Sequence, residues 1–267
     1  MSISNMNFLE RILYLLQRYG VSYLKGAGTT LAIALVSTAI GCLIGFVVGV
    51  VQTIPVDKKR DSAAKRGLLR VVKMILKAYV ELFRGTPMIV QAVFIYYGLS
   101  QMFQIQLGMW SAAFLVVSIN TGAYMAESVR GGIISVDPGQ MEGAKAIGMT
   151  HVQAMKNVIL SQAIRNIMPQ IGNNLIINIK DTSVLSVISI VDLFFVHKSV
   201  AGALYTYFES ATIVMAIYLT MTLVTSRLLL LVEKKMDGDA NYELVDTMDI
   251  GNQLRTIREN DGEGRRG

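Results

Sequence analysis

Two sets of polar side chains lie at helical spacing within otherwise apolar parts of the sequence. The sets are Asn174, Asn178 and Asp181, and Asn120, Tyr124 and Glu127. Residues three or four positions apart share one face of a helix. If these parts cross a bilayer, a charged side chain near the centre costs about 2.5–3.5 kcal/mol on insertion scales, so it faces a cavity or a partner. Carboxylate and amide groups at one depth predict a site that binds a polar solute.

Positive charge lies close to both sets. Lys180, Arg84 or the N terminus of a helix broken at residues 85–87 would donate to an anionic group. The alternative is structural, because Asn and Ser within spans often only hydrogen-bond neighbouring helices, at about 0.6 kcal/mol each. Two pairs at i, i+3 are instead predicted as interfacial salt bridges: Glu81 with Arg84, and Glu127 with Arg130.

The composition places these residues in a membrane protein. Of 267 residues, 52% are hydrophobic and only 16% charged, with a mean hydropathy of +0.47, whereas soluble domains are about 25% charged. The apolar residues form long charge-free runs, which exclude a disordered chain, a collagen-like fibre and a coiled coil. Cys42 alone forms no disulfide framework, and His151 and His197 are too far apart in sequence to indicate a metal cluster. The sequence therefore predicts no metal site.

Five membrane spans account for the apolar runs. Residues 26–56 are free of charge, and residues 29–51 alone are long enough to cross about 30 Å of hydrocarbon. The charge-free window 85–126 fits spans two and three, joined by a turn at residues 104–108, with span two starting near Val71. Residues 168–191 and 209–232 complete the set. The predicted fold class is all-α, a polytopic membrane protein with five transmembrane helices.

The distribution of Lys and Arg sets the predicted orientation, because cytoplasmic loops carry the excess. Most of them fall in residues 57–77, in residues 130–166 and after the fifth span. The N terminus is therefore predicted outside and the C terminus in the cytoplasm. The predicted division of the chain is an amphipathic helix on the outer surface (1–25), a five-span domain with a cytoplasmic loop at about 135–165 (26–235), and a flexible cytoplasmic tail (236–267).

The loop between spans three and four carries sharp local signals. Asp137 is a good N-cap followed by Pro138 at the first helical position, and Gly148 stands where a helix ends in a left-handed residue. Thr150 and Gln153 form a capping box that starts a second helix running toward Pro169. The prediction is a helix over 138–147, a glycine turn and a second helix.

Sequence motifs in this loop and in the spans resemble those of a known family. The loop contains EGAKAIG (142–148) followed by VILS (158–161), which resembles the EAA motif of bacterial ABC-importer permeases. Gly143 and Ser161 depart from the motif's usual alanine and proline. The segments ELFRGTP (81–87) with Gln91, NTGAYMAESVRGG (120–132) and KDTS (180–183) are similar to the polar amino acid uptake family, which includes histidine, glutamine, arginine and cystine permeases.

The resemblance implies a type I ABC importer transmembrane domain in the bacterial plasma (inner) membrane. Such a permease pairs with a second permease subunit, either a copy of itself or a sister chain. Two ATPase subunits dock on the cytoplasmic loops, and an extracytoplasmic binding protein delivers the amino acid. The resemblance places ATPase coupling on Glu142, Gly143, Ala144, Gly148 and Leu160.

The chain has no phosphate-binding Gly-x-x-x-x-Gly-Lys-Ser/Thr motif, so ATP and Mg²⁺ are expected on the partner ATPase and no cofactor on this chain. For an amino acid substrate, the candidate contacts are Asp181, Asn178, Asn174, Asn120, Tyr124, Lys180 and Arg84. Asp181 with Asn120 or Asn178 would accept from the ammonium group.

Two other classes of function use the same residues. An intramembrane enzyme would take Asp181 or Glu127 as its acid or base, but it needs a second catalytic group at the same depth. An ion channel or proton-coupled carrier would use a buried Asp without needing the cytoplasmic loop. Small residues at every fourth position, Ser37, Gly41, Gly45 and Gly49, also predict a close helix contact, within the subunit or across a dimer.

Overall fold

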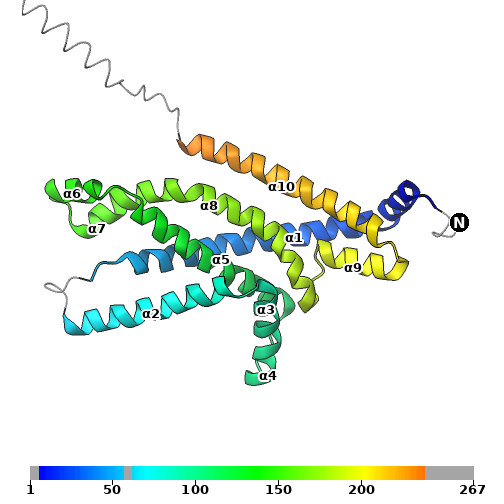
Figure 1. Cartoon of the computed structure of the whole chain (residues 1–267), viewed down its shortest axis with the longest axis horizontal. Coiled ribbons are helices and arrows are strands. Elements are labelled where there is room, and N and C mark those ends of the chain that lie inside the picture. Colours follow the sequence, from blue (N-terminus) through cyan, green and yellow to red (C-terminus); the bar gives the residue numbers. More distant parts are fainter. Residues whose placement is uncertain (1–5, 57–61, 238–267) are drawn as a thin grey trace, which may run out of the picture. The chain divides into compact units, whose positions relative to one another are not determined.

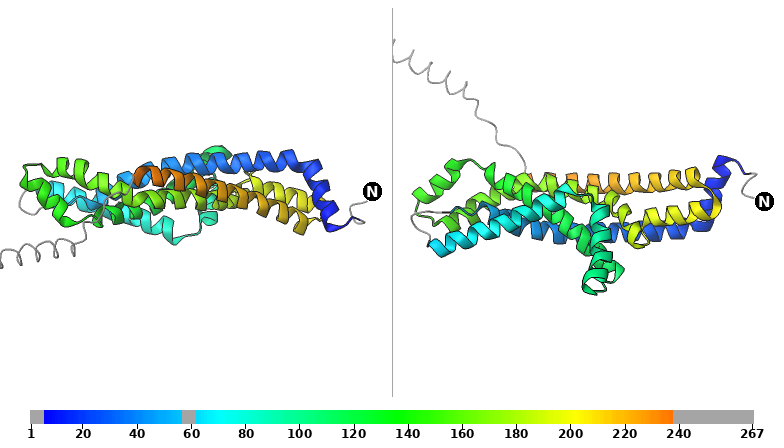
Figure 2. Two further views of the ribbon diagram at one scale, coloured as in Figure 1. Left: turned by 90° about the horizontal axis from the view of Figure 1, so that it is seen from above. Right: turned by 60° about the horizontal axis from the view of Figure 1, so that its bottom comes forward.

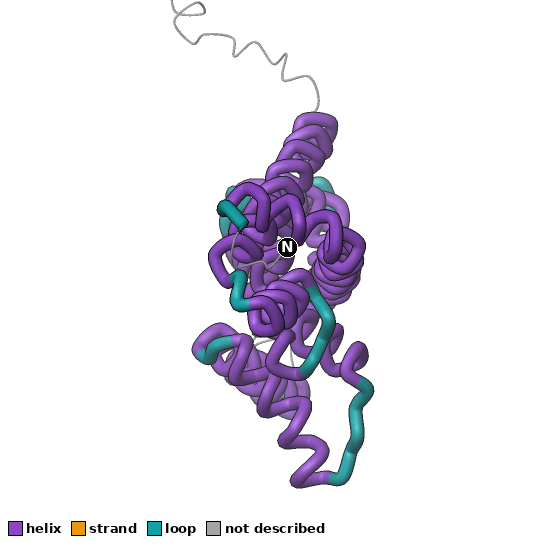
Figure 3. The backbone as a smooth tube through the Cα atoms, turned by 90° about the vertical axis from the view of Figure 1, so that its right-hand side faces the viewer, coloured by secondary structure: helices purple, strands orange, loops and turns teal. Residues whose placement is uncertain are grey.

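The computed structural model describes residues 6–56 and 62–237, and all regular structure in this part is helical (Figures 1 and 3). The α-helices are α1 (Phe8–Thr53), α2 (Ala63–Gly85), α3 (Met88–Val93), α4 (Leu99–Phe103), α5 (Met109–Ile134), α6 (Pro138–Ala146), α7 (His151–Ala154), α8 (Leu160–Asp181), α9 (Leu193–Leu204) and α10 (Tyr207–Asp237). Two π-helical turns, η2 (Phe94–Gly98) and η3 (Met155–Ile159), and a 3₁₀ helix, η4 (Thr182–Ile188), lie between them. Residues up to Glu233 form one compact unit, and a second unit begins at Lys234.

Several predictions fall partly or wholly outside the described residues. Residues 1–5 of the predicted outer helix are among them, as are residues 57–61, which carry three of the basic residues used for orientation. The predicted cytoplasmic tail is described only as far as residue 237.

Helix α1 joins the predicted outer helix and the first span without a break at residue 25. Figure 2 shows its first turns, in dark blue, set at an angle to the rest. Leu15 is fully buried in a cluster with residues of α9 and α10, whereas Leu9 and Leu13 remain exposed. Part of the apolar face predicted for the membrane surface therefore packs against the protein itself.

The ridge of small residues on α1 packs against α5 of the same chain, which confirms the contact within the subunit. Gly41 lies against Thr121, Gly45 against Met125 and Ala126, and Gly49 against Val129. Both numbers rise together along this contact, so α1 and α5 run in the same direction. The absence of side chains lets the two backbones approach closely.

The helices that follow alternate in direction. Asn178 of α8 bonds Thr121 of α5 and Asn174 bonds Met125, so α8 runs antiparallel to α5. Helix α10 returns along α8, because Leu229 lies next to Gly172 while Val214 lines the same cavity as Lys180.

Three helices of the described chain are long and apolar enough to cross a membrane: α1, α5 and α10. Helix α8 with its preceding turns, and α9 beyond a bend of 54°, form a pair that would be a fourth span. The predicted second span is divided, because the chain breaks at Thr86 and Pro87 between α2 and the shorter apolar stretch Met88–Phe103. Figures 1 and 2 show α3 and α4 pointing away from the direction of α2.

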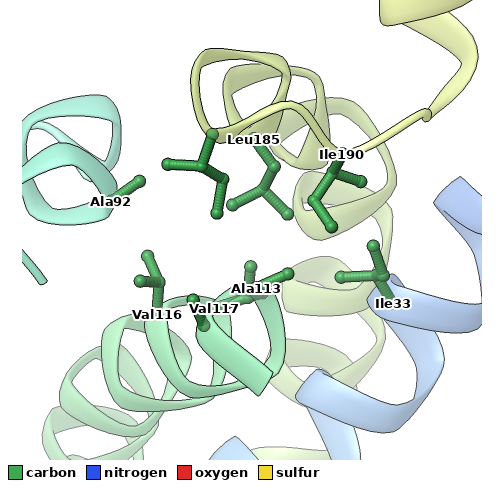
Figure 4. Close-up of a cluster of buried hydrophobic side chains, with 9 residues drawn as sticks. Ile33, Ala92, Ala113, Val116, Val117, Leu185 and Ile190 are labelled. Carbon is green, nitrogen blue, oxygen red and sulfur yellow. The ribbon is translucent and has the colours of Figure 1, made fainter. Parts of the chain in front are cut away.

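The divided segment is held by a buried apolar cluster. Ile33 of α1, Ala92 of α3, Val116 of α5 and Leu185 of η4 meet there, each fully buried (Figure 4). Four elements far apart in sequence are thus fixed around the break.

The loop predicted to lie in the cytoplasm has the structure that its local signals predict. Helix α6 is capped by Asp137, whose Oδ1 accepts from the backbone N–H of Gly139 at 2.7 Å. Gly148 has a φ of +89°, a conformation that L side chains rarely adopt. The capping box of Thr150 and Gln153 is formed, but the second helix continues through Pro169 to Asp181.

We expect Gly45→Ala to lower the stability of the folded chain by about 1–3 kcal/mol, because its Cβ would overlap that of Met125 and lie 2.8 Å from the backbone nitrogen of Ala126. Gly28→Ala on the same helix is the control, since a Cβ there meets nothing within 4 Å. Thermal unfolding in detergent measures both variants. Equal melting temperatures for the two would contradict the close α1–α5 contact.

Candidate functional site

A polar cavity of about 500 Å³ lies between α2, α5 and α8. Its polar lining includes Arg84, Tyr124, Glu127, Gln170, Asn173 and Asn174. Of the residues predicted to contact substrate, the structure thus brings together Arg84, Tyr124 and Asn174. Part of each of the two polar stripes that were predicted to line one pocket does line this cavity.

Arg84 is the centre of charge in this cavity. Its guanidinium carbon lies 5.5 Å from the centre of the Tyr124 ring, and its Nη1 is 4.0 Å from Oε2 of Glu127. Glu127 also accepts two hydrogen bonds from Arg130, one from Nε at 3.2 Å and one from Nη2. The predicted Glu127–Arg130 pair is confirmed. The predicted Glu81–Arg84 pair is wrong, because Glu81 pairs with Lys77 at 3.5 Å, one turn earlier on α2.

The charges of this cavity favour an anionic group. Since Arg130 already binds both oxygens of Glu127, the contact from Arg84 at 4.0 Å is long and leaves its N–H donors available. Exposed amides from Asn173 and Gln170 can accept or donate beside it. A carboxylate at Arg84, with neighbouring amide oxygens for an ammonium group, fits this arrangement.

Asn120 lies away from this cavity, at the break after α2. Its Nδ2 donates to the carbonyl of Phe83 at 3.2 Å and to Oε1 of Gln91 at 3.0 Å. Gln91 in turn donates to the carbonyls of Phe83 and Thr86, both at 2.9 Å. These bonds satisfy carbonyls that the interrupted helix leaves without an N–H partner.

Asn178 is buried and bridges three helices. Its Nδ2 donates to Oγ1 of Thr38 on α1 at 2.7 Å and to Oγ1 of Thr121 on α5 at 2.9 Å. Both N–H groups of the amide are therefore occupied within the protein, as the structural alternative expected. Asn174, one turn earlier, is half-buried and bonds Met125 and the carbonyl of Gln170 while lining the cavity.

Asp181 and Lys180 lie at the far end of α8 and are exposed. The carboxylate of Asp181 makes no hydrogen bond within the described residues. Lys180 lines a second cavity, of about 490 Å³, together with His197 and Tyr218. The structure therefore separates this pair from Arg84 and Tyr124.

A buried polar network around α9 was missed by sequence analysis. Tyr23 and Ser210 hydroxyls are 2.7 Å apart, and Nδ1 of His197 lies 3.0 Å from the same serine oxygen. His197 is thus a half-buried residue of α9. Arg11 pairs with Glu209 at 3.0 Å nearby. Because these residues are distant in sequence, no local pattern connects them.

Asp192, also missed, is fully buried and caps α9, with Oδ1 accepting from Phe195 N–H at 2.8 Å. Its position before an apolar run is an N-cap signal that could have been recognised from the sequence.

The residues predicted to couple to an ATPase lie on α6, in the turn that follows it and at the start of α8. Glu142, Gly143 and Gly148 are exposed, Ala144 is buried, and Leu160 packs at the edge of a buried cluster. Two exposed apolar residues stand beside them and were missed: Ile147, 76% exposed, and Val152, 73% exposed. Both side chains are large and apolar, and they stand on either side of the turn at Gly148. Hydrogen bonds from α8, Gln162 to Gln140 and Asn166 to Ser135, hold the loop in place.

Metal chemistry has no support in the described part of the chain, where no three His, Cys, Asp or Glu side chains are placed to hold an ion.

Comparison with known proteins identifies the family. Residues 62–238 match the family model described as the inner membrane component of binding-protein-dependent transport systems, so the chain belongs to this family. The nopaline transport system permease protein NocM of Agrobacterium fabrum is 38% identical over 219 residues, covering 79% of this chain and 86% of the relative. The arginine transport system permease protein ArtQ of Bacillus subtilis is 33% identical over 216 residues, covering 81% and 93%.

A solved structure agrees with these relatives. The crystal structure of an amino acid ABC transporter with histidines has a TM-score of 0.74 and 35% identity, and the match covers 86% of this chain and 99% of that one. The resemblance to amino acid ABC permeases is confirmed. The chain is a multi-pass membrane subunit of a transporter and not an enzyme, and in such systems the ATPase is a separate subunit.

We expect Asn178→Ala to lower the stability of the chain by about 1–2 kcal/mol, because two buried threonine hydroxyls lose their donor. Asn173→Ala is the control, because it removes the same kind of side chain from the same helix. Asn173 is exposed, so the melting temperature of this variant should equal that of the parent. Thermal unfolding of the purified chain distinguishes them. A lower melting temperature for Asn173→Ala alone would contradict the structural role of Asn178.

Proposed function

We propose that this chain is the permease subunit of an ATP-driven importer that moves a polar amino acid into a bacterial cell by alternating access. The observation that carries the proposal is the cytoplasmic hairpin of α6, Gly148 and α7, with Ile147 and Val152 exposed at its tip. A relative and a solved structure named for amino acid transport support the class of substrate.

Five crossings with the N terminus outside fit the directions of the helices. Since α1 and α5 run the same way, the chain between them must cross back once, through α2 and the residues that follow its break. Helices α8 and α10 then add one crossing each. An odd number of crossings agrees with the charge distribution, which favours a cytoplasmic C terminus.

The hairpin would transmit motion from the ATPase. Exposed apolar residues at a helix end fit a groove on a partner, and the left-handed Gly148 sets the angle between the two helices. Two ATPase subunits would bind the hairpins of two paired permease subunits, with ATP and Mg²⁺ held by the ATPase and no cofactor by this chain. Closure of the ATPase pair would rock the spans between outward and inward access.

Substrate would pass the polar cavity of Arg84, Tyr124 and Asn174 on its inward route. A polar amino acid needs a donor for its carboxylate and acceptors for its ammonium group, and Arg84 with the neighbouring amides supplies both. An extracytoplasmic binding protein would deliver the substrate at the opposite end, where Lys180 and Asp181 lie exposed.

Ile147→Asp should abolish coupling, because a charge replaces the exposed apolar anchor of the hairpin. The full chain is purified with its associated subunits, and ATP hydrolysis is measured with polar amino acids and the binding protein. We expect an ATPase subunit to co-purify with the parent chain and with Ile147→Leu, and at least tenfold less with Ile147→Asp. Absence of any ATPase from the intact parent complex would overturn the proposed function.

Arg84→Gln should lower ATP-dependent uptake in proteoliposomes by about tenfold or more, because a charge-assisted hydrogen bond to the substrate carboxylate is lost. Lys198→Gln removes the same charge at an exposed position of α9 and should leave uptake unchanged. Co-purification of the ATPase confirms that each variant assembles. Unchanged uptake by Arg84→Gln would exclude this cavity from the substrate route.

A further inference from the structure

Helix α2 carries a stripe of charged residues, of which the proposed function uses only Arg84. Its members are spaced by three or four positions: Arg66, Arg70, Lys73, Lys77, Glu81 and Arg84. Residues at this spacing lie along one face of a helix. Large apolar side chains on the rest of α2 are exposed, among them Leu68 (66%), Met74 (65%) and Ile75 (60%). The helix therefore presents a basic face and an apolar face side by side.

The basic face borders a cavity of about 450 Å³ between the end of α1, α2 and α5. Its charged lining consists of Lys73, Lys77, Glu81, Arg84, Glu127 and Arg130. Four cations face two carboxylates, so the cavity has an excess of positive charge. The cavity is separate from the substrate cavity, although Arg84 and Glu127 stand between the two and line both.

The two carboxylates already have cationic partners, whereas one cation, Lys73, has no carboxylate partner among the described residues. Glu127 binds Arg130, and Glu81 pairs with Lys77 at 3.5 Å. The ammonium group of Lys73 donates to the backbone carbonyl of Ile54 and lies near no carboxylate of the described residues. An ammonium group has three donors, so Lys73 keeps capacity for an anion.

We infer that this cavity binds the phosphate of an anionic phospholipid from the cytoplasmic leaflet. The inference rests on the proposed orientation, which places the start of α2 and the end of α1 on the cytoplasmic side. Basic cavities between helices on this side attract anionic headgroups, and the exposed apolar face of α2 offers a surface for the acyl chains. A zwitterionic lipid lacks the net charge that the cavity complements.

The test is native mass spectrometry of the full-length chain in detergent, incubated with phosphatidylglycerol or phosphatidylcholine. We expect one phosphatidylglycerol retained per chain in preference to phosphatidylcholine. The double variant Lys73→Gln/Lys77→Gln should lose this preference by about tenfold. Lys73→Arg/Lys77→Arg should keep it, and this variant also shows that a loss does not come from misfolding.

The matched control is Lys156→Gln/Lys198→Gln, which removes two exposed charges elsewhere and should retain the parent's preference. Equal retention of both lipids by the parent chain would overturn the inference, as would an unchanged preference in Lys73→Gln/Lys77→Gln. Displacement of phosphatidylglycerol by a free amino acid would instead assign the cavity to the substrate. Lipid retention is measured without transport. A failure of the uptake assay would therefore count against the proposed function alone, and a failure of lipid retention would count against this inference alone.

Discussion

The close contact between α1 and α5 is the constraint on which the rest of the fold depends. A Cβ at Gly41, Gly45 or Gly49 would overlap atoms of α5, so the close contact requires glycine at these three positions. The positions of the glycines therefore set the register in which the two backbones pack. That register presents the other faces of α5 to two further helices. Tyr79 of α2 donates to the carbonyl of Ile119, and Asn178 of α8 bonds Thr121.

Polar residues within these helices divide into two groups by the bonds that they make. Asn178 and Asn120 are engaged inside the protein, where an unsatisfied backbone or hydroxyl group would be costly in a bilayer. Arg84 and Tyr124 are exposed to a cavity. The break after α2 explains why Asn120 is engaged and Tyr124 is not. Asn120 donates to the carbonyl of Phe83 that the break leaves free, whereas Tyr124, one turn further along α5, lies beside no such carbonyl of the described residues.

Sequence patterns predicted what local chemistry determines. The caps at Asp137 and Thr150 and the turn at Gly148 act within a few residues, so their structure follows from their neighbours. Spacing also placed Asn174, Asn178 and Asp181 along one helix, but it could not identify which helix each one meets. The network of Tyr23, Ser210 and His197 depends on contacts between distant segments and has no local signal.

The helical structure that follows Gly148 is continuous, and it connects the hairpin to the polar cavity. From His151 the helical path runs through η3 and α8 to Asp181 without a non-helical residue, and Pro169 does not interrupt it. A displacement at α7 would therefore move this helical segment as one unit, since a packed helix resists bending more than a loop does. The same helical path carries Asn174 at the polar cavity and Lys180 at its far end, so a displacement of the hairpin would change both places together.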